Sequence, residues 1–274
     1  MIKNIKVALI GNPNTGKTSV FNALTGLNQK VGNYPGITVE KKQGSCRLDR
    51  ATKARILDLP GTYSLNASSM DESVVVELLL NKNDPDFPDV AIVVTDVENL
   101  KRNLLLFSQI KDLEIPTVLV INMSDQMKRK GIQIDLEKLE EKLNTKVVLV
   151  STRQNLGVSQ LKQILVNYRS IPNTPMFDPT SIDKKYFESL QKAFPSQSLY
   201  KLWLVITKMS ISLNWSDKKC PIRQISELNL NLTSKNYNRG KQSSVIKLLI
   251  KFLKRPTRLI SKRRQTCVSG WIIY

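Results

Sequence analysis

The stretch Gly11-Asn12-Pro13-Asn14-Thr15-Gly16-Lys17-Thr18 matches the phosphate-binding pattern G-x-x-x-x-G-K-[ST] at every fixed position. An apolar run over residues 5–10 precedes it and a helix-like run follows it, which is the strand, loop and helix context that the motif requires. The glycines let backbone N–H groups turn toward a phosphate, and the start of the helix adds partial positive charge. We therefore expect Lys17 to reach the β and γ phosphate oxygens and the Thr18 hydroxyl to bind Mg²⁺.

The length and composition of the chain limit its class. Its 274 residues suffice for one large domain, or for a domain of about 170 residues with a smaller partner. Three scattered cysteines (Cys46, Cys220 and Cys267) and the absence of histidine argue against a zinc site and a disulfide framework. No apolar run approaches the ~18 to 20 residues that span a bilayer, and no signal-peptide core begins the chain. We expect a soluble protein in a reducing cytoplasm.

The charge is unevenly distributed. The formal net charge is +19, and residues 209–274 contain 14 Lys and Arg but only 2 Asp and Glu. The segment is rich in Ser and Asn, and its aromatic residues are not interleaved with the basic cluster. A solvated basic tail is one interpretation, and a tail that binds RNA or a membrane surface is another.

Apolar runs alternate with amphipathic segments through the first 170 residues, which is the order of an α/β protein. The expected strands are residues 5–10, 38–48, 55–58, 90–95, 117–122 and 146–150. The expected helices are residues 17–25, 71–81, 99–113, 135–143 and 158–168. Open α/β sheets bind nucleotides at the C-terminal ends of their strands, so the ligand loops are expected at that edge.

Prolines divide the rest of the chain. Pro172, Pro175 and Pro179 bias their predecessors away from helix, which indicates a linker. Beyond it, residues 181–190 and 197–207 have the pattern of amphipathic helices. The expected organisation is a first domain at 1–170, a linker at 171–180, the start of a helical domain at 181–208 and a basic tail at 209–274.

The segment Asn122-Met123-Ser124-Asp125 follows an apolar strand and carries the Asn and Asp of the guanine-recognition motif N-K-x-D. The Asp125 carboxylate can accept from guanine N1–H and from the exocyclic amine, a donor pair that adenine lacks. Asn122 is expected to tie this loop to the phosphate loop. Met123 stands where Lys is usual; its apolar stem can still cover the base, so we expect weaker affinity rather than lost specificity. The motif selects GTP over ATP.

Three further segments complete a GTPase set. Asp58-Leu59-Pro60-Gly61 matches D-x-x-G, in which Asp58 holds an Mg²⁺-bound water and the Gly61 N–H faces the γ-phosphate. Ser151-Thr152-Arg153 follows a strand and fits the last guanine-contact loop. Thr38, 20 residues beyond Thr18, is the candidate switch threonine that completes the Mg²⁺ shell when GTP is bound. The nucleotide-binding residues expected are Gly11, Asn12, Pro13, Asn14, Thr15, Gly16, Lys17, Thr18, Ser19, Gly36, Ile37, Thr38, Asp58, Gly61, Asn122, Met123, Asp125, Ser151, Thr152 and Arg153.

Two more strings accompany these motifs: Val31-Gly32-Asn33-Tyr34-Pro35-Gly36-Ile37-Thr38-Val39-Glu40, and Thr62-Tyr63-Ser64-Leu65 directly after the D-x-x-G motif. Taken together, the strings resemble the cytoplasmic G domain of the FeoB family of bacterial ferrous iron transporters. The string at 31–40 is the most characteristic. The resemblance covers residues 3–170, continues more weakly through 199–204 and fades after Lys208. It implies a Ras-like P-loop GTPase with a mixed, mostly parallel sheet, followed by a small helical domain.

The resemblance also implies an activity and its ligands. Mg²⁺-dependent hydrolysis of GTP to GDP would be coupled to Fe²⁺ uptake, with Thr18, Thr38 and Asp58 as Mg²⁺ residues. K⁺ would bind the Asn14 side chain and the backbone carbonyls of Gly32 and Tyr34, and would neutralise charge on the leaving group. The catalytic set expected is Lys17, Asn14, Thr38 and Gly61. Thr62 stands where Ras-like enzymes have glutamine, so unassisted hydrolysis should be slow.

The resemblance implies partners and a location as well. The partners are a membrane transporter domain, normally in the same chain, other iron-uptake proteins and a homo-oligomer, with no nucleic acid. The place of action is the cytoplasmic face of the bacterial inner membrane. Because the chain holds no membrane span, we entertain the hypothesis that residues from about 209 onward are translated out of frame in a transporter gene that ends early.

Two alternatives of other classes stay open at this stage. A soluble GTPase that acts on ribosomes or tRNA through the basic tail would explain the charge, since phosphate contacts favour Lys and Arg. It explains residues 31–40 poorly. A GTP-binding regulator with negligible turnover is suggested by Thr62.

Overall fold

The computed structural model describes residues 3–27, 29–34, 37–67, 69–181, 183–195 and 197–205. The chain divides into two compact units, with the boundary after Met176. The predictions for Gly36, for the end of the expected helix at 197–207 and for the basic tail at 209–274, with its frameshift hypothesis, lie outside the described residues.

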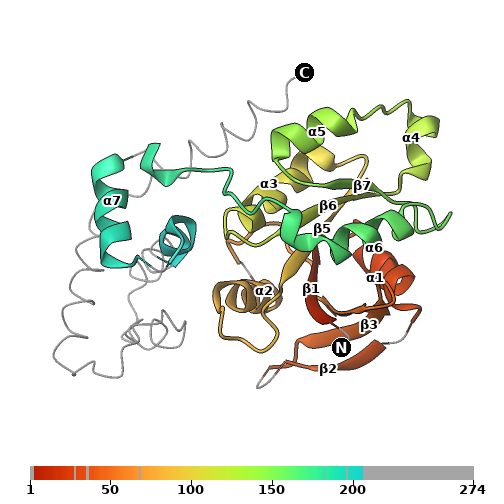
Figure 1. Cartoon of the computed structure of the whole chain (residues 1–274), viewed down its shortest axis with the longest axis horizontal. Helices are drawn as coiled ribbons and strands as arrows, with labels where there is room; N and C mark the ends of the chain where they lie inside the picture. The colour runs from red at the N-terminus through yellow and green to blue at the C-terminus, as the bar shows by residue number, and fades with distance from the viewer. Residues whose placement is uncertain are drawn as a thin grey trace. The chain divides into compact units, whose positions relative to one another are not determined.

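The first unit contains a seven-stranded sheet in the order β2-β3-β4-β1-β5-β6-β7 (Figure 1). The strands are β1 Lys3–Gly11, β2 Gln29–Asn33, β3 Glu40–Arg47, β4 Thr52–Asp58, β5 Val90–Asp96, β6 Thr117–Asn122 and β7 Val147–Leu149. Strands β4, β1, β5, β6 and β7 pair in parallel, whereas β3 is antiparallel to both β2 and β4. The prediction of a mixed, mostly parallel sheet is confirmed.

The helices connect the parallel strands, as a parallel sheet requires. They are α1 Lys17–Thr25, α2 Met70–Leu80, α3 Leu100–Lys111, α4 Asp125–Lys130, α5 Leu136–Leu143 and α6 Val158–Val166, followed by a 3₁₀ turn, η1 Tyr168–Ser170. Strand β2 and helix α4 were not predicted. The strand expected from residue 38 begins at Glu40 instead, and Thr38 lies exposed before it.

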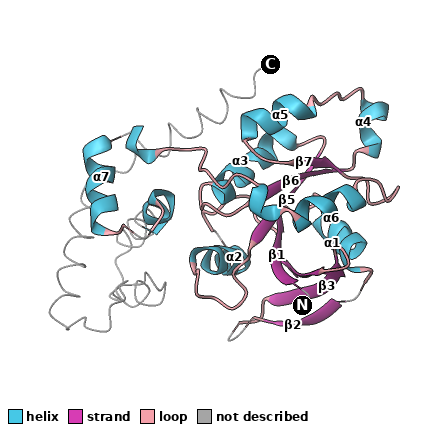
Figure 2. Cartoon of the chain, viewed as in Figure 1, coloured by secondary structure: helices cyan, strands magenta, loops and turns pink. Residues whose placement is uncertain are grey.

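Helices cover both faces of the sheet (Figure 2). Alternate strand residues such as Val7, Ile56 and Ile92 pack with Phe21 of α1 and Leu161 of α6 in one buried cluster. The intervening residues, Ala8, Ile10 and Val93 among them, are also buried but lie outside that cluster. Because successive side chains of a strand point to opposite faces, these residues form the second layer of the core, next to α3.

The second unit begins with a 3₁₀ turn, η2 Pro179–Ser181, and helix α7 Lys184–Ala193. The side chain of Asp183 accepts a hydrogen bond of 2.9 Å from the Tyr186 backbone N–H, which caps the helix. Phe187 and Leu190 lie one turn apart on its buried face, and residues 199–205 are helical and buried from residue 200 onward. Within the described residues, none of the helices has the length and apolar character needed to span a lipid bilayer.

Candidate nucleotide-binding site

Four parallel strands end at one edge of the sheet, three of them with a polar residue and one with a glycine. Gly11 ends β1, Asp58 ends β4, Asp96 ends β5 and Asn122 ends β6. Adjacent parallel strands end at the same side, so the loops that follow them lie next to one another. The Asp96 carboxylate stabilises the following turn and helix, since it accepts hydrogen bonds from Asn99 and Asn103. The other three loops form the candidate site.

The phosphate loop needs its glycines. Gly16 has φ 78°, and a Cβ there would lie 2.3 Å from Asn122 Nδ2. A Cβ at Gly11 would lie 2.6 Å from the Val94 carbonyl oxygen. Asn14 also has a positive φ of 68°, which Asn tolerates better than most residues. The loop is thus wrapped tightly between β5 and the guanine-recognition segment, with its backbone rather than side chains lining the turn.

Lys17 forms an ion pair with Asp58. The Asp58 residue is only 5% exposed, and this burial raises the pKa of its carboxyl group, while the Lys17 ammonium beside it acts in the opposite direction. The ammonium is therefore the counter-charge of the aspartate in this structure. A carboxylate buried at a phosphate loop and neutralised by a cation is the arrangement that a magnesium site also requires.

The guanine-recognition segment is fastened to the phosphate loop. Asn122 Nδ2 donates to the Thr15 carbonyl oxygen at 3.1 Å, as its predicted role requires. Asp125 Oδ1 accepts from the Ser151 hydroxyl at 2.9 Å. The Met123 Cε atom lies 3.6 Å from the position of a Cβ on Gly16. The structure thus joins three predicted segments, those at 11–18, 122–125 and 151–153.

Two buried side-chain oxygens at these loops have acceptor capacity to offer a ligand. Among the described residues, Asn12 Oδ1 and Asn122 Oδ1 are buried without a hydrogen-bond partner. A buried acceptor without a partner costs about 1–3 kcal/mol. The closely packed glycines and the cation-paired carboxylate fit a nucleoside diphosphate with Mg²⁺, and the two acceptor oxygens fit N–H or water donors of such a ligand.

The segment after β2, which we call switch I (residues 34–39), contributes less. Tyr34 is buried, its backbone N–H donates to the Val39 carbonyl oxygen at 3.0 Å, and its own carbonyl oxygen accepts from the Ile37 N–H at 3.3 Å. Thr38 is exposed, and within the described residues no hydrogen bond joins it to Thr18 or Asp58. The structure does not bring Thr38 to Thr18 and Asp58, the other residues expected to bind Mg²⁺.

The segment after β4, which we call switch II (residues 59–69), packs on the phosphate loop. A Cβ on Gly61 would lie 3.2 Å from Pro13 Cγ, and the Thr62 N–H donates to the Gly11 carbonyl oxygen at 3.2 Å. The Thr62 side chain is fully buried; its hydroxyl lies 2.8 Å from the Ser64 carbonyl oxygen and 3.1 Å from Glu72 Oε1. The hydroxyl is therefore held between switch II and the first turn of α2.

Glu72 is a residue that the sequence analysis missed. It lies in the first turn of α2, is 8% exposed and also accepts from the Tyr63 backbone N–H at 3.3 Å. An acid in the first turn of a helix is ordinarily explained by the helix dipole, so its pattern gave no signal. The D-x-x-G motif followed by an acid near the next helix start could have drawn attention to it.

Several other predicted residues lie at the exposed rim of the candidate site. Thr18, Ser19 and Arg153 are exposed, and Thr152 is half-buried. Gly32 is exposed in β2, and the Asn14 side chain is exposed with no hydrogen bond to a described residue. These positions are open to a ligand.

Comparisons with known proteins give a consistent result. The family profile of the ferrous iron transport protein B matches residues 5–165. The Fe(2+) transporter FeoB of Leptospira biflexa serovar Patoc is 44% identical over 164 residues, which are 60% of this chain and 23% of that protein. The chain therefore spans about a quarter of the length of the curated relatives it matches.

Solved structures agree with the sequence relatives. The G domain of the T. maritima FeoB iron transporter has a TM-score of 0.55 and 41% identity, and the match covers 61% of this chain and 99% of that one. A GDP-bound S. thermophilus NFeoB E67A mutant has a TM-score of 0.67 and 27% identity, with 97% of both chains covered.

Proposed function

The chain belongs to the ferrous iron transport protein B family, and from this membership we propose that it acts as the guanine-nucleotide switch of a ferrous iron uptake system, binding GTP and hydrolysing it to GDP. One observation supports this most directly. Asn122 ties the guanine-recognition segment to the phosphate loop, and Ser151 holds Asp125 beside it. The GDP-bound relatives are consistent with the same ligand.

We assign the nucleotide contacts by chemistry. The backbone N–H groups of residues 11–18 would bind the phosphates, with Lys17 moving from Asp58 to the β and γ oxygens. The Asp125 carboxylate would accept from the guanine base. Met123 and the loop at 151–153 would cover the base.

Magnesium fits the donor set at the phosphate loop. Thr18 and Asp58 offer a hydroxyl and a carboxylate, which are hard oxygen ligands, and Thr38 would join them when switch I closes. When bound, the ion would neutralise negative charge on the β and γ phosphate oxygens. Because the ion pair of Lys17 with Asp58 already shows that this carboxylate takes a cation, we expect Mg²⁺ to replace the ammonium there.

Potassium stimulation rests on Asn14, Gly32 and Tyr34. The Asn14 side chain is open to a ligand, and the Tyr34 carbonyl oxygen, with two lone pairs, can accept a cation in addition to the Ile37 N–H. A monovalent cation there would stabilise charge on the leaving phosphate. Since the Thr62 hydroxyl is held by Ser64 and Glu72, we expect turnover to be slow in the absence of that cation.

Transport itself is a proposal about a longer protein. The relatives are iron transporters of which this chain matches about a quarter, so we propose a membrane transporter part as the partner of this switch, at the cytoplasmic face. Fe²⁺ would be the cargo of that part. Within the described residues, no group of three His, Cys, Asp or Glu could hold a metal ion. The alternative of a ribosome- or tRNA-acting GTPase gains no support, because the basic segment that suggested it lies outside the described residues.

Guanine specificity tests the proposal. Fluorescent GDP bound to the full chain should be displaced by GDP and not by ADP. Replacing Asp125 with Ala removes two charge-assisted hydrogen bonds to the base, so we expect GDP affinity to fall by roughly 10- to 100-fold. Glu141→Ala, at an exposed position of α5, is the matched control and should bind GDP like the wild type. Equal displacement by ADP and GDP would refute a guanine switch.

A further inference from the structure

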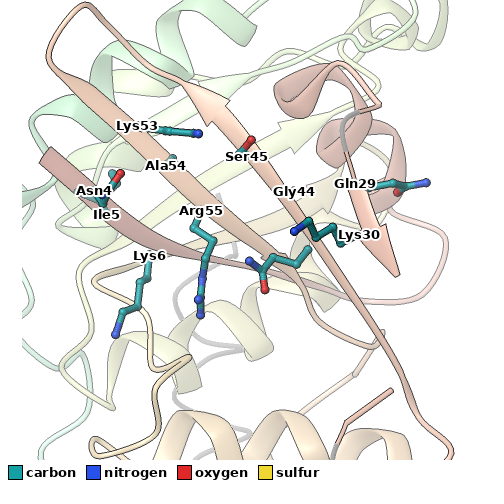
Figure 3. Close-up of a pocket in the computed structure, with 11 residues that line it drawn as sticks. Asn4, Ile5, Lys6, Gln29, Lys30, Gly44, Ser45, Lys53, Ala54 and Arg55 are labelled. Carbon is teal, nitrogen blue, oxygen red and sulfur yellow. The ribbon is translucent and has the colours of Figure 1, made fainter. Parts of the chain in front are cut away.

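A second site lies on the sheet, away from the nucleotide loops. A groove of about 780 Å³ is lined by the first halves of β1 and β4 and by parts of β2 and β3 (Figure 3). Its polar lining includes Asn4, Lys6, Lys30, Gln43, Lys53 and Arg55. The nucleotide loops follow the opposite ends of β1 and β4, so the groove is a separate feature.

Strand pairing explains why these side chains share one face. Asn4 is paired with Lys53 and Lys6 with Arg55 in the parallel register of β1 and β4. In the antiparallel registers, Lys30 is paired with Gln43. Paired residues point to the same side of a sheet, and the alternate residues between them, such as Ile5 and Ala54, are buried in the core. Figure 3 shows Lys6 and Arg55 extending to the same side.

The groove is cationic and largely uncompensated. Within the described residues, Lys6, Lys30 and Lys53 form no ion pair, and no carboxylate side chain lines the groove. Arg55, which is paired with Lys6 in the sheet, is neutralised by its ion pair with Asp86, whereas the three lysines have no such counter-charge among the described residues. An anionic partner would supply that counter-charge.

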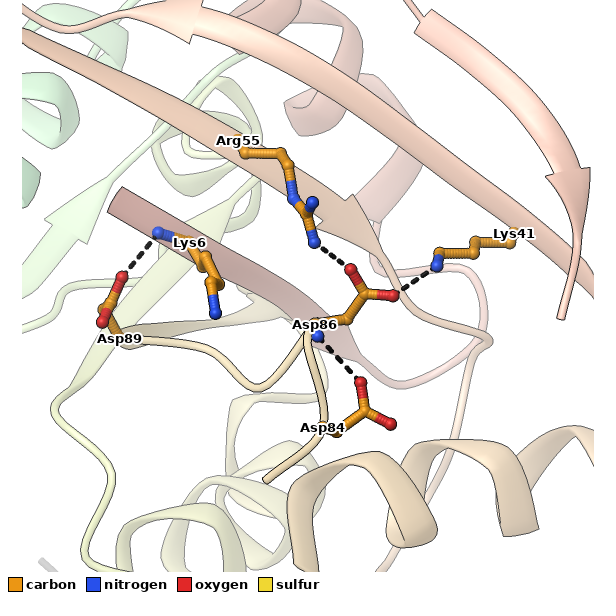
Figure 4. A network of polar contacts seen from close by, with 6 residues as sticks. All are labelled: Lys6, Lys41, Arg55, Asp84, Asp86 and Asp89. Atoms are coloured by element: carbon orange, nitrogen blue, oxygen red, sulfur yellow. Dashed lines mark hydrogen bonds and ion pairs between the residues drawn. The ribbon is translucent and has the colours of Figure 1, made fainter. Parts of the chain in front are cut away.

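The chain itself shows what kind of anion suits this face. The loop between α2 and β5 contains Asp84, Asp86 and Asp89, and Asp86 forms ion pairs with both Arg55 and Lys41 (Figure 4). Asp89 accepts from the Lys6 backbone N–H at 2.7 Å. A carboxylate of a loop segment thus already pairs with two basic side chains at the border of this face.

We propose that the open groove binds an acidic, extended peptide segment of a partner protein. Asn4, Gln43 and neighbouring Ser45 offer hydrogen-bond donors and acceptors for peptide groups, and the lysines pair with its carboxylates. A membrane surface is a poorer fit, because interfacial binding needs exposed apolar side chains and the apolar lining, Ile5 and Ala54, is buried. Lys30 lies on β2, the strand that leads into switch I.

The test uses the full chain and a fluorescent peptide of alternating Asp and Ser. Lys30 and Lys53 are exposed, so Lys30→Glu combined with Lys53→Glu should leave the fold and GDP binding unchanged. We expect peptide affinity to fall roughly tenfold. The neutral pair, Lys30→Gln with Lys53→Gln, should show a smaller loss and guards against an effect of charge reversal on folding.

Two controls separate the groove from general basicity. Lys101→Glu with Lys142→Glu changes the net charge equally on exposed positions of α3 and α5, and should bind the peptide like the wild type. A photo-reactive form of the peptide should cross-link to β1, β2, β3 or β4. Equal losses of peptide affinity in both double variants would overturn the proposal, and so would cross-links confined to residues 209–274. Binding to phosphatidylserine vesicles is measured in parallel. If the groove variants lost binding to the vesicles but not to the peptide, the proposal would also be overturned.

Discussion

At the scale of single residues, Asn14 offers the sharpest test of the proposed potassium site. Its backbone has a positive φ of 68° and its side chain is exposed. Asn14→Gly removes the side chain while easing the backbone conformation, so the loop should keep its shape. We expect single-turnover GTP hydrolysis by the wild type to be faster in KCl than in NaCl, and this advantage to vanish in the variant.

The control for this prediction is Asn173→Gly, an exposed asparagine outside the phosphate loop. It should retain the KCl advantage. GDP affinity measured in NaCl should be similar in all three proteins, because the side chain of Asn14 is assigned to the cation rather than to the nucleotide. A KCl advantage that persists in Asn14→Gly would remove this side chain from the mechanism.

At the scale of elements, the C-terminal end of α3 links distant parts of the first unit. Gln109 Oε1 accepts from the Leu65 backbone N–H of switch II at 2.8 Å. Lys111, fully buried, donates to the carbonyl oxygens of Asn144 and Pro172. Asp112 accepts from the Met176 N–H at 2.8 Å. One helix therefore contacts both switch II and the segment that leads into the second unit.

The buried ammonium of Lys111 predicts a pH dependence. Burial lowers the pKa of Lys111 from 10.5 to about 8. Between these values the unfolded chain binds more protons than the folded one, so this residue's contribution to stability rises with pH. Relative to Lys111→Met, the wild type should gain on the order of 1 kcal/mol in unfolding free energy per pH unit from about 8 to 10.

Urea denaturation at several pH values measures this difference. Lys101→Met, on the exposed side of the same helix, is the matched control and should show no such change relative to the wild type. A wild-type minus Lys111→Met difference that stays constant across the range would mean that the folded state does not depress the pKa of this amine.

The elements found by sequence and those missed differ in what they bury. Helix α1 was predicted to the residue because the phosphate-loop motif marks its start and Gly26 ends it with a left-handed φ of 61°. Strand β2 is exposed along its whole length, and helix α4 buries no residue. Without a buried face neither has a hydrophobic period, so pattern reasoning has no signal for them. The groove escaped prediction for a related reason, since its residues come from four strands and each of its charged residues is an ordinary outward-facing residue.

At the scale of the whole molecule, the position of the unit boundary has an energetic consequence. The sequence suggested a first domain at 1–170, whereas residues 171, 172, 174 and 176 contact the first unit, Thr174 through a hydrogen bond of 2.8 Å from the Asn144 side chain. Ile171 belongs to its buried core, the Pro172 carbonyl oxygen accepts from Lys111, and the Met176 N–H donates to Asp112. A chain ending at 176 should therefore be more stable than one ending at 170, by on the order of 3 kcal/mol.

Nucleotide binding should respond differently from stability. The last residue assigned to the nucleotide is Arg153, so both truncated chains should bind GDP with similar affinity under conditions where both are folded. Chemical denaturation with and without GDP separates the two quantities, because a ligand that binds only the folded state adds the same increment to each chain when the affinities are equal. If the chain ending at 170 were as stable as the chain ending at 176, the contacts of Lys111 and Asp112 would add nothing to the first unit, and its boundary would lie where the prolines placed it.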